Sequence, residues 1–408
     1  MATLEVPIPV VPIEPKVDKE HPMKCVEWHG KKSVRVNTAR PSPLITHPGD
    51  AIIRVTSTSI CGSDLHLFLG FMPGMKAGDI VGHEFMGVVH DVGDDVKGFG
   101  KGDRVVAAFD IACGDCFFCN KLKLFTCCDR TNPSKEEEKL YGDRTAGFFG
   151  YSHLTGGWPG GQAEYVRVPL ADMNLLKVPE DMPDEKLLFL SDILPTAWHA
   201  NELGEVGPGD NVAIWGAGPV GILSAHVANF RGAGNVFLID EFDYRLEHAK
   251  SRMPFVKPIN FKKEKVYDII RKDLPYGPDV GIDAVGMHYA HSMLNRMEIA
   301  VGLETDTPEV LNEIIYTVRK GGRISIIGAY GGYVNHLNVG AFMEKSLTMR
   351  GGQTPCQSYW PKLLEMVKNG ELDPTIVVTH EGSLEQSTHF YQIFNDKQDG
   401  CIKVVMHP

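Results

Sequence analysis

The chain has 408 residues, of which 43% are hydrophobic and 23% are charged, and its formal net charge is −11. This length predicts about two domains, and the composition is typical of a globular protein with a sizeable core rather than of a disordered chain. The negative charge argues against a surface for nucleic acids or anionic membranes, which attract basic patches, and leaves small-molecule chemistry as the favoured class of function.

The first residues, MATLEVPIPVVPIEPKVDKEHP, are rich in proline and valine and lack the basic and hydrophobic regions of a signal peptide. An extended arm and a disordered tail both match this composition. No apolar run in the chain approaches the length of about 20 residues that spans a bilayer. We therefore predict a cytoplasmic protein that binds neither membranes nor nucleic acids.

Short β-like runs separated by Gly, Pro and Asp extend from residue 23 to about residue 177 and predict a β-rich domain. These runs cover residues 51–55, 87–92, 103–107 and 163–168. From about residue 209, apolar strands alternate with helical stretches, which is the pattern of a doubly wound parallel sheet. Its strands are expected at residues 211–215, 236–240, 280–285 and 323–327.

The segment after residue 352 is expected to contain a helix at 359–368, a further helix and a last strand at 401–406. These elements are too few to form a domain of their own. We therefore expect this segment to return to the first domain.

Four cysteines in one loop, Cys113, Cys116, Cys119 and Cys127, follow the spacing C-x2-C-x2-C-x7-C. Two-residue gaps turn successive thiolates toward one point, and four sulfurs match the closed tetrahedral shell of a structural zinc ion. Paired disulfides and unrelated free thiols are the alternatives, but in a cytosolic chain such spacing usually binds metal. Cys128 directly follows the fourth cysteine and is an alternative ligand, although adjacent thiolates rarely point the same way.

A dinucleotide-binding fingerprint lies between the first strand of the α/β half and the helix that follows it. Its residues are Gly216, Ala217, Gly218, Pro219, Val220 and Gly221. In such a motif the first glycine allows a tight turn, the second lets the backbone approach the pyrophosphate, and the third lets helix and strand pack closely. The helix N-terminus then faces the phosphates. A glycine-rich turn without a ligand is the alternative.

Asp240 ends the second strand of this half and follows the fingerprint at the distance expected for a ribose-binding acid. Its carboxylate can accept hydrogen bonds from the adenosine ribose and would repel a 2′-phosphate, which favours NAD over NADP. Arg245 lies nearby in the sequence and can accommodate that phosphate, so NADP stays open as the alternative.

Two further motifs, Cys61-Gly62-Ser63-Asp64-Leu65-His66 and Gly82-His83-Glu84, precede the cysteine loop. With the loop, the glycine-rich turn and the trailing acid in this order, the chain resembles the zinc-dependent medium-chain alcohol dehydrogenases from residue 23 onward. The runs ICGSDLH, VGHEFMG and LSDILPT are similar to the branch that contains glutathione-independent formaldehyde dehydrogenases.

The resemblance implies an α/β fold in three parts. Residues 1–192 would form a GroES-like β-rich catalytic domain with both zinc sites, residues 193–351 a Rossmann doubly wound NAD-binding domain, and residues 352–408 a segment that returns to the catalytic domain. Two zinc ions per subunit, one catalytic and one structural, would be bound. Relatives pair through their coenzyme sheets, which implies a homodimer or homotetramer.

The resemblance also assigns the catalytic metal ligands. Cys61, His83 and Asp192 would bind the catalytic zinc and leave one position open for water or a substrate oxygen. Taken alone, Asp192 would instead be assigned as a helix N-cap. Glu84 would be a carboxylate that can approach the ion, and Asp64 would hold the other ring nitrogen of His83.

The remaining roles follow from the same motifs. Ser63 would accept the proton of the alcohol, and His66 would pass it to solvent, a role that suits an imidazole. Gly62 stands where many relatives carry an Arg or Lys for the coenzyme pyrophosphate. Lys403 matches another position that the family uses for this phosphate.

The implied activity is hydride transfer between NAD and a small alcohol or aldehyde. An aldehyde dismutase or glutathione-independent formaldehyde dehydrogenase with retained NAD is a second hypothesis. It is favoured by a long segment at 286–308, similar to an insertion that covers the adenine, and a second long segment lies at 129–160. The third hypothesis is a coenzyme-binding protein without catalytic activity. The presence of the metal ligands Cys61, His83 and Asp192 argues against it.

Overall fold

The computed structural model describes residues 9–287 and 306–408. The chain divides into two units, of which the first comprises Met1–Pro195 and Thr354–Pro408 and the second comprises Thr196–Gln353. The C-terminal segment therefore belongs to the first unit. In the structure the first part ends at residue 195 and the C-terminal segment begins at residue 354. The sequence analysis placed these two boundaries at residues 192 and 352.

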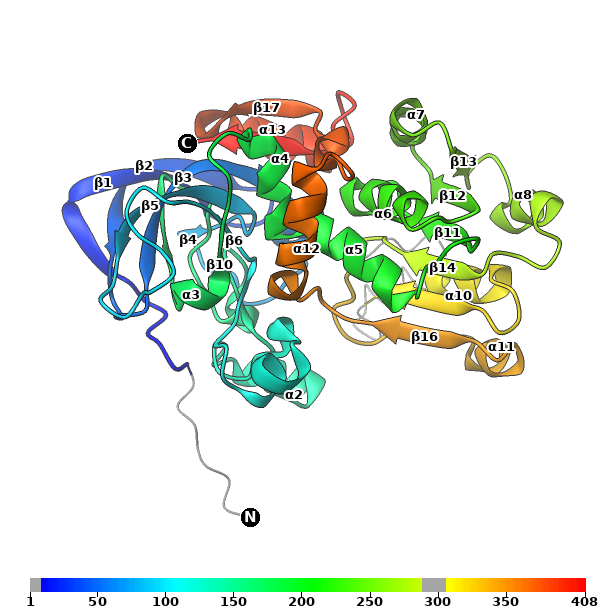
Figure 1. Ribbon diagram of the computed structural model, residues 1–408, viewed down its shortest axis with the longest axis horizontal. Coiled ribbons are helices and arrows are strands. Elements are labelled where there is room, and N and C mark those ends of the chain that lie inside the picture. Colours follow the sequence, from blue (N-terminus) through cyan, green and yellow to red (C-terminus); the bar gives the residue numbers. More distant parts are fainter. Residues whose placement is uncertain (1–8, 288–305) are drawn as a thin grey trace, which may run out of the picture. The chain divides into compact units, whose positions relative to one another are not determined.

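The first unit is rich in β-structure (Figure 1). Its main sheet has the strand order β10-β6-β5-β3-β18-β17, and β9 also pairs with β3. These strands are β3 (Ala51–Ile60), β5 (Phe85–Val92), β6 (Arg104–Ala107), β9 (Tyr165–Val168), β10 (Leu175–Lys177), β17 (His380–Ser383) and β18 (Val404–His407). Because β18 joins β3, the C-terminal segment completes this sheet.

Two smaller sheets flank the main one. A long hairpin of β1 (Lys16–Trp28) and β2 (Val34–Leu44) pairs with β4 (Asp79–Ile80), and β7 (Asp110–Ile111) pairs with β8 (Gly147–Phe148). The sequence did not predict the hairpin. Most of the first half of β1 is exposed, so it lacks the alternation of apolar and polar residues that marks a half-buried strand.

The helices of the first unit are short, apart from two in the C-terminal segment. They are α1 (Gly62–Phe68), α2 (Lys135–Tyr141), α3 (Ala171–Asn174), α4 (Asp184–Leu187), α12 (Cys356–Lys368) and α13 (Ser387–Asn395). Single helical turns lie at Phe118–Leu122, Phe125–Cys127, His153–Thr155, Leu188–Ser191, Pro374–Val377 and Leu384–Gln386.

The second unit is built on a six-stranded parallel sheet with the order β13-β12-β11-β14-β15-β16. The strands are β11 (Asn211–Trp215), β12 (Asn235–Asp240), β13 (Val256–Asn260), β14 (Val280–Asp283), β15 (Arg323–Ile326) and β16 (Thr348–Gly351). This is the Rossmann strand order, in which the coenzyme binds where the order reverses. The central strands are almost continuously buried, as expected of a sheet covered on both faces.

Helices cover both faces of this sheet (Figure 1). They are α5 (Ile193–Leu203), α6 (Pro219–Phe230), α7 (Asp243–Arg252), α8 (Val266–Asp273), α10 (Glu309–Thr317) and α11 (Val339–Glu344). Within the described part of the chain, no helix combines the length and apolar character needed to cross a membrane.

The described part of the N-terminal segment packs against the first unit. Val11 is buried in its core, the Val10 amide donates a hydrogen bond to the Arg130 carbonyl, and the Arg167 guanidinium donates to the carbonyls of Pro12 and Ile13. From residue 9 onward the segment is therefore an arm that lies on its own unit.

Candidate functional site

Four potential metal ligands come together in the first unit. Cys61, His83, Glu84 and Asp192 are buried, and their ligand atoms all lie within 4.8 Å of one another. Cys61 is the N-cap residue between β3 and α1, His83 and Glu84 directly precede β5, and Asp192 follows the turn Leu188–Ser191. The ends of two strands of one sheet and a helical turn thus bring residues distant in sequence to one point.

The imidazole of His83 is held between two carboxylates. Its Nδ1 lies 3.1 Å from Asp64 Oδ1, the contact that was predicted for Asp64, and its Nε2 lies 3.3 Å from Asp192 Oδ2. If the Nδ1–H group of His83 donates to Asp64, the lone pair of Nε2 points at the Asp192 carboxylate. Cys61 Sγ lies 4.0 Å from the same carboxylate oxygen. Such facing lone pairs need a proton or cation between them, so the residues fit a metal ion.

The charges around His83 favour positive charge at this point. Burial alone would lower the pKa of His83, but the carboxylates of Asp64 and Asp192 raise it well above its ordinary value. A zinc ion with a thiolate and a carboxylate as ligands would satisfy the same demand without a proton.

The turn that carries Asp192 is held by α12. The Trp360 indole donates to the Leu190 carbonyl at 2.8 Å, and the Cys356 thiol donates to the Ser191 carbonyl at 3.3 Å. The position of the carboxylate therefore depends on the C-terminal segment.

Lys403 lies in this cluster, and its predicted role at the coenzyme phosphate stays a prediction. Its side chain is fully buried, and its Nζ lies 2.6 Å from Glu84 Oε2. Burial alone would lower the pKa of Lys403, but the negative charges of Glu84 and Cys61 raise it. A buried carboxylate such as Glu84 needs a buried cation beside it, and Lys403 supplies that charge. The Ser59 hydroxyl donates to the same carboxylate.

The structure places the two predicted proton-transfer residues on α1. The Ser63 hydroxyl lies 4.0 Å from Cys61 Sγ, so it borders the cluster. His66 is 7% exposed, and its ring lies beside that of Phe71 with 6.5 Å between centroids. Their predicted roles in moving a proton stay predictions.

Aromatic side chains that the sequence analysis missed surround His83. The rings of Phe109 and Tyr151 stand edge-on to the imidazole, with centroids 6.4 and 6.0 Å away. Phe148 lies next to both, 5.1 Å from Phe109 and 6.1 Å from Tyr151. No spacing in the sequence marks these residues, because they reach His83 through the pairing of β7 with β8.

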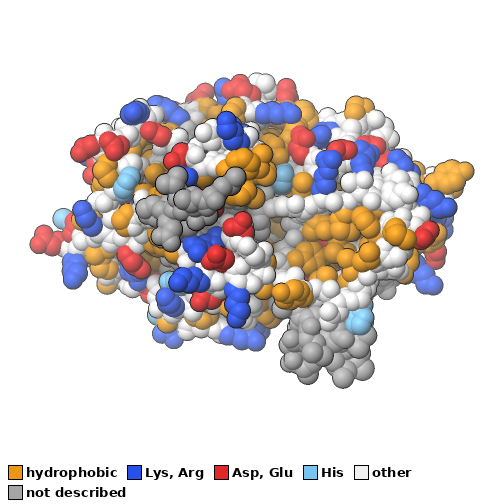
Figure 2. All heavy atoms as spheres, turned by 90° about the horizontal axis from the view of Figure 1, so that it is seen from below, with side chains coloured by type: hydrophobic (Ala, Val, Ile, Leu, Met, Phe, Trp, Pro, Cys, Tyr) orange, Lys and Arg blue, Asp and Glu red, His pale blue; other side chains and the backbone are white. Residues whose placement is uncertain are grey.

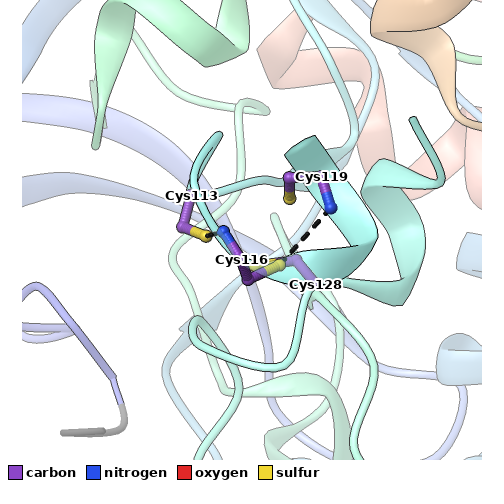
Figure 3. A group of neighbouring side chains, drawn as sticks. All are labelled: Cys113, Cys116, Cys119 and Cys128. Atoms are coloured by element: carbon purple, nitrogen blue, oxygen red, sulfur yellow. Dashed lines mark hydrogen bonds between the residues drawn. The ribbon is translucent and has the colours of Figure 1, made fainter. Parts of the chain in front are cut away.

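A second group of potential ligands contains Cys113, Cys116, Cys119 and Cys128, whose sulfur atoms all lie within 4.8 Å of one another (Figure 3). The amide of Cys116 donates to the sulfur of Cys113, and the amide of Cys119 donates to the sulfur of Cys116, both at 3.4 Å. Amide donors stabilise thiolates, so this group fits a tetrahedral metal ion.

The prediction of Cys127 as the fourth cysteine of this group is wrong. Cys127 ends the helical turn Phe125–Cys127 and keeps part of its surface exposed, whereas Cys128 is fully buried among the other three. Interactions with the sulfurs of Cys113 and Cys119 lower the pKa of Cys128 although burial opposes this. The helical turn directs the two side chains apart, and spacing alone does not reveal which one faces inward.

The glycines of the fingerprint have the packing that a dinucleotide site requires. Gly216 has a φ of +97°, and a Cβ on Gly221 would lie 1.8 Å from the Gly216 carbonyl oxygen. A Cβ on Gly218 would meet nothing within 4 Å, so the backbone there faces open space at the start of α6. Pro219 and Val220 form the first turn of this helix.

Asp240 lies at the same turn. Its Oδ2 accepts a hydrogen bond from the Ala217 amide at 2.7 Å and lies 3.6 Å from Arg245 Nη1. The guanidinium of Arg245 also lies over the rings of Phe242 and Tyr244. The predicted acid and arginine therefore face each other beside the fingerprint. Of the long segment at 286–308, residues 288–305 lie outside the described residues.

Comparison with known proteins decides the family. Residues 47–180 match the alcohol dehydrogenase GroES-like domain. A zinc-type alcohol dehydrogenase-like protein of Schizosaccharomyces pombe is 42% identical over 94% of this chain and 90% of its own length. The chain belongs to the zinc-dependent medium-chain alcohol dehydrogenases.

Two further comparisons place this medium-chain dehydrogenase among its relatives. The alcohol dehydrogenase TADH from Thermus sp. ATN1 superposes with a TM-score of 0.78 at 33% identity, covering 94% of this chain and 99% of that one. The formaldehyde dismutase of Pseudomonas putida is 35% identical over 84% of this chain and 87% of its own length. As a member of the family, the chain is a zinc-dependent oxidoreductase with GroES-like and Rossmann domains.

Proposed function

We propose that this dehydrogenase transfers hydride between a small alcohol or aldehyde and NAD, with catalysis at Cys61, His83 and Asp192. The observation that carries the proposal is the orientation of His83, whose Nδ1 lies on Asp64 while its Nε2 faces Asp192 and Cys61. These three residues would hold a zinc ion, which would supply a Lewis acid for the substrate oxygen.

The chain's own residues would handle the proton. Ser63 borders the metal ligands and would accept the proton of the alcohol, and His66 would pass it to solvent. Lys403 neutralises Glu84, so this second carboxylate does not add an unbalanced negative charge to the thiolate of Cys61 and the carboxylate of Asp192.

The contacts of Asp240 support NAD rather than NADP. The Ala217 amide fixes its carboxylate at the fingerprint, where it can accept bonds from the ribose hydroxyls and would repel a 2′-phosphate. Arg245 already faces Asp240 and two aromatic rings, so its charge is partly compensated. Within the same proposal, Cys113, Cys116, Cys119 and Cys128 bind a second, structural zinc ion.

The likeness to formaldehyde dismutase supports a second candidate, an aldehyde dismutase that retains NAD. Such an enzyme would oxidise one aldehyde and reduce another without exchanging its coenzyme. Protein purified with an empty coenzyme site and dependent on added NAD would contradict this candidate.

We also propose that the chain forms a homodimer or homotetramer through its second unit. Among the described strands β16 pairs with β15 alone, and most of its residues are exposed. On α11, Val339 and Met343 are 61% and 66% exposed. Figure 2 shows hydrophobic side chains gathered in the right-hand half of the face seen from below. An exposed strand edge beside apolar side chains favours pairing with another copy.

The experiment that tests the proposed function compares the wild-type protein with Cys61→Ser. Alcohols and aldehydes are screened with NAD and NADP by absorbance, zinc is measured by mass spectrometry, and light scattering on the same preparation gives the molar mass. We expect two zinc ions per chain and NAD-dependent turnover in the wild type. Cys61→Ser should lose about one zinc and nearly all activity.

Cys127→Ser is the matched control, since Cys127 lies outside both groups of ligands. Full activity of the Cys61→Ser protein would refute the site. Equal turnover with NADP would refute the argument from Asp240.

A further inference from the structure

Three potential metal ligands that belong to neither group described above lie together on the first unit. Glu185 lies on α4, Glu381 lies on β17, and His407 ends β18. One ligand atom of each residue lies within 4.8 Å of those of the other two. Because Glu381 pairs with Val405 and His407 lies two residues further along the same strand, both side chains project from one face of the sheet.

The hydrogen bonds of His407 determine which ring nitrogen carries the proton. Its Nδ1 lies 3.1 Å from the carbonyl oxygen of Thr56, which can only accept, so Nδ1 donates. Nδ1 also lies 3.2 Å from the hydroxyl of Ser57, whose own proton is donated to Asp184 at 2.9 Å. Both contacts require the proton on Nδ1, and a neutral imidazole then has its free lone pair on Nε2.

This lone pair lies in an acidic environment. Nε2 of His407 is 4.0 Å from Glu185 Oε1, and the carboxylate of Glu381 completes the group. Within residues 9–287 and 306–408, neither glutamate forms an ion pair with a lysine or an arginine. Two carboxylates and a nitrogen lone pair at one point attract a cation. A metal-binding histidine commonly donates its other ring nitrogen to a backbone carbonyl, as His407 does.

We propose that Glu185, Glu381 and His407 form a third metal site, which binds an exchangeable zinc ion and ties α4 to β17 and β18. Imidazole with carboxylate suits zinc, whereas Mg²⁺ and Ca²⁺ prefer oxygen ligands alone. The side chains of His407 and Glu185 are 42% and 28% exposed, so the ion stays in contact with water and exchanges with it. The site is separate from the chemistry proposed above.

The binding test uses the full-length protein after dialysis against zinc-free buffer at about pH 7.5, where most free imidazole is neutral. Calorimetry with zinc chloride should show one further ion per chain with a Kd of about 10 µM, since an open site binds more weakly than a closed one. Glu381→Gln and His407→Gln should each weaken this binding about tenfold or more.

His21→Gln is the matched control for these variants. His21 also contacts a carboxylate, that of Asp18 at 2.7 Å, but no described residue adds a third ligand there. Its substitution should leave the binding of the further zinc ion unchanged. Millimolar Mg²⁺ should not displace this ion.

Hydrogen exchange locates the ion on the chain. With free zinc at about ten times the Kd, the amides of residues 184–191 and 380–383 should exchange about tenfold more slowly wherever opening of α4 from the sheet releases the ion. Glu381→Gln should remove this protection. It should leave exchange in the absence of added zinc unchanged, because Glu381 is exposed.

Several results would overturn this inference. They are a wild type that binds no zinc beyond the ions retained on dialysis, an affinity that Glu381→Gln and His407→Gln both leave unchanged, and an equal loss of binding in His21→Gln. Displacement by millimolar Mg²⁺, or protection confined to other segments, would equally reject the site. A wild type that binds the further ion but turns over no alcohol or aldehyde would contradict the proposed function alone.

Discussion

At the scale of single residues, the two adjacent cysteines after the cysteine loop have opposite environments. Cys128 is buried among three other sulfurs, and Cys127 is not. We expect Cys128→Ser to lose one zinc ion per chain and to unfold at a lower temperature, because a structural zinc contributes directly to folding. Cys127→Ser should keep both ions. Metal analysis of the two variants, side by side, would reject the assignment if the losses were reversed.

Some contacts of single residues in the candidate site could be predicted from the sequence, and others could not. The resemblance to the family implied that Cys61, His83, Glu84 and Asp192 belong together, although Asp192 taken alone would be assigned as a helix N-cap. The contact of Lys403 with Glu84 could not be predicted this way. Whether a lysine on a strand meets a phosphate or a buried carboxylate depends on which face of the sheet it occupies and what lies there, and both are settled only by the strand pairing.

At the scale of elements, the turn from β11 into α6 contains two glycines that are needed for different reasons, Gly218 and Gly221. Gly221 must be small because the Gly216 carbonyl fills the space beside it, whereas Gly218 faces open space. We expect Gly221→Ala to destabilise the fold by about 1–3 kcal/mol through overpacking. Gly218→Ala should fold normally and bind NAD about tenfold more weakly, since its methyl group would occupy the approach of the pyrophosphate.

Thermal unfolding and fluorescence titration with NAD distinguish these two variants. The prediction fails if Gly218→Ala lowers the unfolding temperature as much as Gly221→Ala does, or if it binds NAD like the wild type. Gly209→Ala is a poor control because Gly209 has a φ of +83°. A Cβ on Gly100 would meet no atom within 4 Å, and its φ is ordinary, so Gly100→Ala serves instead.

The elements themselves were predictable to different degrees. The central strands of the second unit are almost continuously buried, and the apolar runs of the sequence placed β11, β12, β14 and β15 within a few residues. The hairpin of β1 and β2 was missed because exposed polar residues occupy much of it. The pairing of β7 with β8, which brings Tyr151 to His83, is too short to leave any periodic pattern.

At the scale of the whole molecule, polar contacts between distant segments make stability depend on pH. Asp184, on α4, accepts hydrogen bonds from Thr56 at 2.5 Å and Ser57 at 2.9 Å on β3, and from Arg104 on β6. Burial alone would raise the pKa of Asp184, but these partners together lower it below its ordinary value of 3.8. Its contribution is therefore complete above about pH 4 and is lost as the pH falls further.

We expect Asp184→Asn to lower the free energy of unfolding by about 1–3 kcal/mol at pH 7. The difference from the wild type should stay constant down to about pH 5 and shrink below pH 4. Denaturant unfolding at several pH values measures this difference. Asp181→Asn is the control, because Asp181 is exposed nearby. A difference that grows on acidification would contradict the assignment.

The discontinuity of the first unit has a consequence for biosynthesis. The second unit is continuous in sequence, so it can fold as soon as residue 353 has left the ribosome. The first unit must wait for β18 to pair with β3 and for Lys403 to neutralise Glu84. We therefore expect the metal-ligand residues of the nascent chain to stay incompletely assembled, with Glu84 unpaired, until translation has passed Lys403.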